Sequence, residues 1–169
     1  MQRISEGTGS VAHDEPARDV SEQPWYADGL WFVCTGCGKC CTGSSGSVYV
    51  SQADLKRLAA FLHMPAGKFA KQYTRSFLGR RALIDRPRSP DCVFLEGKAC
   101  TVYEARPTQC RTFPWWGQNL HDHESWEEAA ESCEGINHPR ASLIPLAEIE
   151  EQRRIDVAND ASSRPEAWR

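Results

Sequence analysis

Eight cysteines in a chain of 169 residues constrain this protein more than any other feature. Four form a C-x2-C-x2-C-C motif, which we call the cysteine knuckle (residues 34–41), and four follow at wider intervals. The knuckle contains Cys34, Cys37, Cys40 and Cys41, and the later cysteines are Cys92, Cys100, Cys110 and Cys133. Two-residue gaps let consecutive thiolates turn back on one ion or cluster. Gly36 and Gly38 permit the left-handed backbone that such a turn needs.

The N-terminus indicates the compartment in which these thiols would function. Residues 1–20 carry four acidic side chains and lack the apolar run of a secretory signal. No segment approaches the ~18 apolar residues that a membrane span needs. We therefore expect a cytoplasmic protein with reduced thiols, in which eight cysteines are better explained by metal binding than by disulfides. Burial as small hydrophobic residues would account for one or two of them.

The number of cysteines suits two centres with four thiolates each. Cys40 and Cys41 are adjacent, and in an extended backbone their side chains point apart, so they can serve different centres. Zinc sites often pair two C-x2-C halves, whereas the later cysteines here are spaced C-x7-C-x9-C-x22-C. The run of three cysteines matches the spacing of bacterial ferredoxins. The pattern favours an iron–sulfur cluster over zinc, and both remain open.

Other polar residues near the cysteines could support such a centre. A thiolate centre is negatively charged, and nearby cations would offset that charge, with Lys39 inside the knuckle as the first candidate. These cations are Lys39, Lys98, Arg106 and Arg111. His121 and His123 could supply a substitute ligand, although a polar run of this kind is more typical of an exposed loop leading into a helix.

Apolar residues are unevenly distributed and define the expected domain. We predict a disordered tail over 1–24, a metal-binding domain over 25–150 and a polar extension over 151–169. The predicted class is α+β. It is a small metal-stapled domain in which short strands and two to four helices surround a cysteine-rich centre.

The local patterns place the elements of that domain. Ser51 is a suitable N-cap for a helix over 52–62, and Pro65 opens a second helix. Phe69, Tyr73 and Phe77 would form the buried stripe of the second helix. Strands are expected at 30–33, 48–50 and 82–84, a loop at 42–47, a helical turn after Pro107, and helices at 124–133 and 145–158. A hairpin is expected from strands at 92–95 and 100–103, each starting with a cysteine.

The residues around the cysteines resemble the YkgJ/CxxCxxCC family. The resemblance rests on Phe32, the knuckle, Val48, Val50, Asp54, Cys92-x-Phe94-Leu95, Cys100-x-Val102-Tyr103-x2-Arg106-Pro107-x2-Cys110-Arg111-x-Phe113-Pro114 and Cys133. Members are described as zinc- or iron-chelating proteins or as iron–sulfur proteins. The resemblance implies that all eight cysteines bind metal in a bacterial cytosolic protein. Flagellin lysine methylases share a similar cluster, but this chain is short for one of those whole enzymes, so methylation is not carried over.

Three functions remain open at this point. The chain contains no P-loop, G-x-G-x-x-G, nucleophile elbow or H-E-x-x-H motif, so whether it is an enzyme stays undecided. The first function is a metal-binding protein with a redox or accessory role, the second a structural zinc module for protein interaction, and the third a protein-modifying enzyme. A net charge of -3 argues against a nucleic-acid partner, and no membrane partner is expected. The expected ligands are metal ions, and a protein partner of unknown identity is compatible with the sequence.

Overall fold

A computed structural model describes residues 23–42 and 47–164 of the chain. Within these residues it contains five α-helices and three two-stranded antiparallel sheets, which confirms the α+β class. The helices outnumber the predicted two to four because the turn after Pro107 is long enough to form the helix α3 (Thr108–Thr112). Most of the predicted tail over 1–24 and of the predicted loop over 42–47 lies outside the described residues.

The first helical pair follows its sequence signals closely. Helix α1 (Gln52–Phe61) begins at Ser51, whose hydroxyl accepts the Asp54 N–H while the Asp54 carboxylate accepts the Ser51 N–H. This reciprocal capping box satisfies two donors at the helix start. Helix α2 (Ala66–Tyr73) begins directly after Pro65, as predicted.

The second helix ends earlier than the aromatic spacing suggests. The chain leaves α2 at Tyr73 and forms β2 (Thr74–Phe77), which pairs with β3 (Arg80–Leu83). Leu78 and Gly79 both have positive φ, as a tight hairpin turn requires, so Phe77 belongs to a strand and is 36% exposed. The expected helical stripe through Phe77 is therefore wrong. The strand expected at 48–50 is reduced to a single bridge between Tyr49 and Ala82.

The cysteine-flanked hairpin forms with shorter strands than predicted. Its strands are β4 (Leu95–Glu96) and β5 (Ala99–Cys100). Cys92 precedes β4 and Cys100 ends β5, so the prediction that each strand starts with a cysteine is wrong. The Leu95 N–H donates to the Cys92 carbonyl at 3.0 Å, so the chain turns after Cys92 before the strand can begin.

The remaining elements join the two ends of the domain. Strand β1 (Leu30–Phe32) pairs antiparallel with β6 (Ser142–Ile144). Helix α4 (His123–Ser132) is capped by Asp122, and helix α5 (Leu146–Ser162) continues across position 150, where the sequence suggested a boundary. Short 3-10 turns occur at η1 (Lys39–Cys41) and η2 (Tyr103–Ala105).

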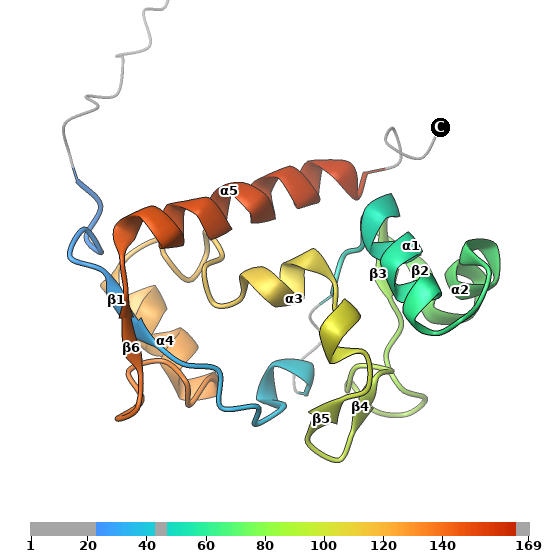
Figure 1. Cartoon of the computed structure of the whole chain (residues 1–169), viewed down its shortest axis with the longest axis horizontal. Coiled ribbons are helices and arrows are strands. Elements are labelled where there is room, and N and C mark those ends of the chain that lie inside the picture. The colour runs from blue at the N-terminus through green and yellow to red at the C-terminus, as the bar shows by residue number, and fades with distance from the viewer. Residues whose placement is uncertain (1–22, 43–46, 165–169) are drawn as a thin grey trace, which may run out of the picture.

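Two separate hydrophobic clusters form the interior. The first core contains Val50, Leu55, Leu58, Ala59, Phe69, Leu83, Phe94, Val102 and Ala105. The second core contains Tyr26, Leu30, Trp115, Leu120, Trp126, Ile136 and Ile149. Figure 1 shows the corresponding elements at opposite ends, with α1, α2 and β2–β3 at one end and α4 with β1–β6 at the other. Helix α5 runs across the top and packs against α3.

Candidate metal centre

All eight cysteines line one pocket of about 500 Å³. The pocket lies between the two cores, because its walls include Leu83 and Phe94 from the first core and Trp115 from the second. The knuckle supplies four of the cysteines, and the others come from the chain before β4, the end of β5, α3 and the C-terminal cap of α4. The structure thus brings together all eight cysteines that the sequence proposed as metal ligands.

Backbone contacts hold both ends of the knuckle in place. At its start, a bridge joins Phe32 to Ile136, and the Val33 N–H donates to the Gly135 carbonyl at 3.0 Å. At its end, the Cys92 N–H donates to the Cys41 carbonyl at 2.8 Å. The first contact places the knuckle beside the segment that follows α4, and the second ties it to the segment that leads to the hairpin.

The glycines of the knuckle adopt the predicted left-handed conformation. Gly36 has φ 69° and Gly38 has φ 74°. Their surroundings differ, since a Cβ on Gly38 would lie 2.4 Å from the Lys98 carbonyl oxygen, whereas a Cβ on Gly36 would meet no atom within 4 Å. Gly38 therefore also permits the knuckle to approach the hairpin turn closely.

Cys41 contacts three other thiols and lies at the centre of a thiol cluster. Hydrogen bonds with Cys100, Cys40 and Cys92 raise the pKa of Cys41 well above its ordinary value. The hydrogen bond from Cys41 is in turn the main cause that lowers the pKa of Cys40 to about 7 and that of Cys100 to about 6. The same contact lowers the pKa of Cys92. The arrangement favours the thiolate form of Cys40, Cys92 and Cys100, and the thiolate is the form that binds metals.

Cys110 and Cys133 have different thiol neighbours. Burial raises the pKa of both thiols. Cys110 also interacts electrostatically with Cys92, Cys40 and Cys100, whereas Cys133 interacts with Cys37 and Cys40. The neighbours of the thiols thus form two sets that overlap at Cys40.

Three of the later cysteines accept hydrogen bonds from backbone amides shortly after them. The Phe94 amide donates to Cys92, the Val102 amide to Cys100, and the Gly135 and Ile136 amides to Cys133. Such bonds stabilise the thiolate and tune a bound metal or cluster. These donors were not predicted from the sequence. The sequence signal that could have indicated these amide donors is the turn that follows each of the three cysteines.

Tyr103 is a contact of the centre that sequence analysis named only as part of the family pattern. Its hydroxyl donates to the Cys34 sulfur at 3.9 Å, and this contact is the main cause of a raised pKa of Tyr103. The Arg106 guanidinium lies 3.9 Å from the centre of the Tyr103 ring. Tyr103 is 42% exposed, so it stands at the solvent-facing side of the thiol cluster.

The predicted counter-charges also lie at the pocket. Lys39, Lys98, Arg106 and Arg111 all contribute to its walls, as does the acidic Glu148. The Lys39 ammonium lies 3.5 Å from the Glu134 carboxylate, so part of its charge is already paired. The basic excess suits a group of thiolates.

The histidine pair lies elsewhere, as the loop interpretation predicted. The side chains of His121 and His123 are 78% and 74% exposed, and neither lines the cysteine pocket. Asp122 between them caps α4 by accepting the Ser125 N–H at 2.8 Å. Trp115 belongs to the second core and packs edge-to-face on Phe32.

The donor set fits a thiophilic metal or an iron–sulfur cluster, because its members are thiols with nearby cations. In the part of the chain that the structure describes, no three or more His, Cys, Asp or Glu side chains already stand in an arrangement that could hold a metal ion. The cysteines therefore gather around the pocket without forming a finished coordination sphere.

Comparison with known proteins agrees with the chemistry of this pocket. The family model named CxxCxxCC, described as a "putative zinc- or iron-chelating domain", matches residues 33–134. The chain belongs to the CxxCxxCC family. This match confirms the resemblance noted from the sequence. The CxxCxxCC domain extends over the knuckle and all four later cysteines, so the thiols of the pocket are those of the family region.

The chain is also similar to an archaeal protein. "Uncharacterized protein MJ0661" of Methanocaldococcus jannaschii is 32% identical over 92 residues, which are 53% of this chain and 48% of the relative. The chain thus spans about half the length of this curated relative. No solved structure matches the chain significantly. Among the described helices, none is long and apolar enough to cross a bilayer.

Proposed function

We propose that this CxxCxxCC domain binds metal through all eight cysteines and has a redox or accessory role in a reducing, cytoplasmic compartment. The observation that carries the proposal is the convergence of eight thiols from the knuckle and four later segments on one pocket. Thiols so far apart in sequence have little reason to share one pocket unless they bind a common group. The cations in the pocket wall support the proposal because they would offset the charge of thiolates.

The contacts support two centres with four ligands each. Cys41 hydrogen-bonds with Cys92 and Cys100, and Cys110 interacts with the latter two. These four thiols would form one centre. Cys133 interacts with Cys37 and Cys40, and Cys34 is the knuckle cysteine that remains, so these four thiols would form the second centre. Cys40 also interacts with Cys100 and Cys110 of the first centre. Cys40 and Cys41 then belong to different centres, and their own contact would hold the two centres close together.

An iron–sulfur cluster is the favoured occupant. Part of the pocket wall is apolar, including Phe32, Val102 and Trp115, and apolar side chains beside a cluster limit access of solvent to it. Backbone amides also donate to the sulfur atoms of Cys92, Cys100 and Cys133. Such donors are a recognised means of tuning a cluster potential.

A structural zinc module is the second candidate. The pocket lies between two cores, so zinc there would hold the halves of the domain together and leave the surface for a partner protein. A protein-modifying role rests only on the resemblance to flagellin lysine methylases.

Purification without air, followed by metal and sulfide analysis, tests the proposal. An iron–sulfur protein would be brown and contain iron with acid-labile sulfide, whereas a zinc module would be colourless with stoichiometric zinc. Recovery of neither iron nor zinc from protein kept reduced would rule the proposal out.

Single-cysteine variants test the assignment of ligands. Cys92→Ala and Cys133→Ala should each lose about half of the bound metal, because each would disable one centre. His121→Ala is the matched control, since it removes a potential metal ligand outside the pocket. Full occupancy in both cysteine variants would contradict the assignment.

A further inference from the structure

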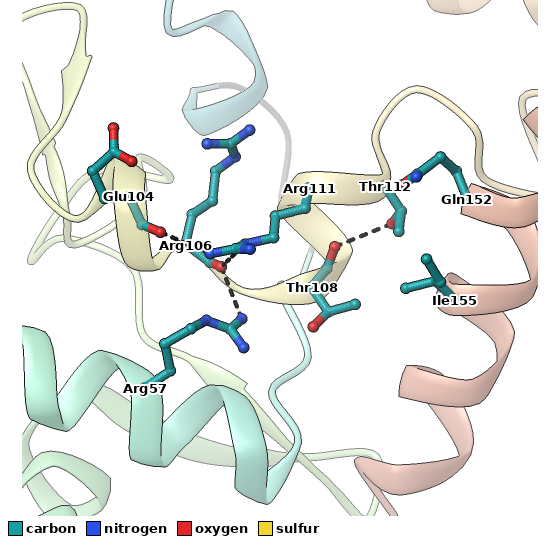
Figure 2. A pocket seen from close by; sticks show the side chains of 8 residues that line it. All are labelled: Arg57, Glu104, Arg106, Thr108, Arg111, Thr112, Gln152 and Ile155. Atoms are coloured by element: carbon teal, nitrogen blue, oxygen red, sulfur yellow. Dashed lines mark hydrogen bonds between the residues drawn. The ribbon is translucent and has the colours of Figure 1, made fainter. Parts of the chain in front are cut away.

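A second pocket of about 510 Å³ lies directly beside the cysteine pocket. The two pockets share Arg106, Arg111 and Gln152 as wall residues. Figure 2 shows that Arg57 approaches from α1, that Arg106 and Arg111 come from the segment around α3, and that Gln152 lies on α5. The guanidinium groups of Arg57 and Arg111 therefore lie together at this opening, whereas the Arg106 guanidinium points away from them toward the thiols.

Hydrogen bonds to the backbone fix two of these groups side by side. The Arg57 Nη2 donates to the Arg106 carbonyl at 3.0 Å, and the Arg111 Nε donates to the same carbonyl at 3.1 Å. Arg111 Nη2 also donates to the Glu104 carbonyl at 2.7 Å, as Figure 2 shows. A guanidinium held in this way loses little freedom when it binds a further group.

The charge of the pocket is balanced only in part by nearby acids. The buried Asp54 pairs with Arg57 and also accepts hydrogen bonds from Thr108. Among the described residues, no ion pair joins Arg106 or Arg111 to an acid. Figure 2 shows the Glu104 carboxylate turned away from the Arg111 guanidinium. The charge of Arg111 thus remains for a ligand at this opening, and that of Arg106 acts on the neighbouring thiols.

Each arginine also retains nitrogen donors for a ligand. Within the described residues, the hydrogen bonds of Arg57 and Arg111 use Nε and Nη2, and that of Arg106 uses Nη1. The Nη1 atoms of Arg57 and Arg111 are left at this opening, whereas the free nitrogens of Arg106 face the thiol pocket. Phosphate and carboxylate oxygens accept charge-assisted hydrogen bonds from guanidinium nitrogens of this kind.

We propose that this arginine pocket binds the phosphate or carboxylate group of a small anionic ligand beside the thiol pocket. Its volume exceeds that of a bare ion and falls in the range of small-molecule sites, so the rest of such a ligand has room. Binding of the anion depends on the arginines. Only the idea that the ligand then lies beside a metal rests on the proposed function.

Calorimetric titration of the full metal-loaded protein tests the proposal, with inorganic phosphate and acetate as separate probes. We expect saturable binding of at least one probe, weakened about tenfold or more in Arg111→Gln, because a charged hydrogen-bonding partner is lost. Arg140→Gln is the matched control, because it removes the same charge from an exposed site outside both pockets. Arg111→Lys retains the charge without the fork and should bind with intermediate affinity. It still tests the site if Arg111→Gln does not fold.

The outcomes separate the ligand classes and the two proposals. Tighter binding of phosphate indicates a phosphorylated ligand, and tighter binding of acetate indicates a carboxylate. No saturable binding of either probe up to about 10 mM, or equal weakening in Arg140→Gln, would overturn the anion site. Metal content measured on the same samples reports separately whether the thiols bind metal.

Discussion

The two cores differ in how the chain builds them. The first core uses one continuous stretch, from Val50 to Ala105. The second combines Tyr26 and Leu30 from the start of the domain with residues from Trp115 to Ile149. The second core therefore forms only when distant parts of the chain meet, and closing so long a loop costs conformational entropy. The thiol pocket lies between them, where a bound metal would lower that cost.

Metal removal should show this difference most strongly. Structural thiolate sites contribute on the order of 10 kcal/mol to folding, so chelation under reducing conditions should destabilise the whole domain. The second core should open first, because it depends on long-range closure. Hydrogen exchange measured by mass spectrometry would compare β1 and β6 with α1. Equal loss of protection in both regions would show that the two cores do not differ in this way.

Removing the largest side chain of the second core tests how far it depends on packing. Trp126 is 1% exposed and stacks on Trp115 with ring centres 5.5 Å apart. Trp126→Ala should cost about 3–5 kcal/mol in the free energy of unfolding of the metal-loaded protein. Trp31→Ala, at a site that is 53% exposed, should have a much smaller effect in the same denaturant titration. Similar losses in the two variants would contradict the packing argument.

The first core could be predicted from sequence better than the second. Ser51, Asp54 and Pro65 mark the helix starts through interactions within a few residues, and the structure confirms both helices. The error at Phe77 arose because spacing by four says nothing of the turn at Leu78 and Gly79. The pairing of β1 with β6 had no local signal, since its partners lie more than a hundred positions apart.

In the candidate site, too, some features could be predicted from the sequence, whereas others depend on contacts between distant segments. The cysteine count and the knuckle spacing predicted a metal site, the family resemblance implied the full ligand set, and the structure gathers these residues around one pocket. The contact between Tyr103 and Cys34 could not be derived from spacing, because it depends on how the knuckle meets the 3-10 turn η2. The arginine pocket was missed for a similar reason, since α1, the α3 segment and α5 supply its walls.

The two knuckle glycines give a sharper test of how the knuckle meets the hairpin. Gly38→Ala should cost about 2–3 kcal/mol, because it combines positive φ with a close approach to the Lys98 carbonyl. Gly36→Ala keeps the positive φ but meets no neighbour, so about 1 kcal/mol is expected. Thermal unfolding and metal content of both variants would measure the difference. Equal effects would mean that the contact with the hairpin does not matter.

The capping box of α1 provides a smaller effect within the first core. Ser51→Ala removes the acceptor for the Asp54 N–H in a buried setting and should cost about 1 kcal/mol or slightly more. The loss should appear as faster hydrogen exchange in α1, with β1 and β6 unaffected. Ser132→Ala at the exposed end of α4 serves as the control. Exchange that accelerates equally in β1 and β6 would show that the cores unfold as one unit.

The hydroxyl of Tyr26 gives the smallest and most specific test of the second core. It donates to the Glu150 carboxylate at 2.7 Å and so connects the start of the domain to α5. Burial, with a further contribution from this bond, raises the pKa of Tyr26 to about 12. The neutral hydroxyl therefore contributes its full stability below the unfolded pKa of about 10, and the contribution is lost as pH rises through about 12.

Tyr26→Phe should cost about 0.5–1 kcal/mol near pH 8, and its deficit should shrink at higher pH because the variant has no hydroxyl to ionise. Denaturant titrations at several pH values from 8 upward would measure how the stability difference between Tyr26→Phe and the unaltered protein changes. Tyr73→Phe serves as a control in the first core. A deficit that stays constant with pH would mean that the hydroxyl does not connect the start of the domain to α5.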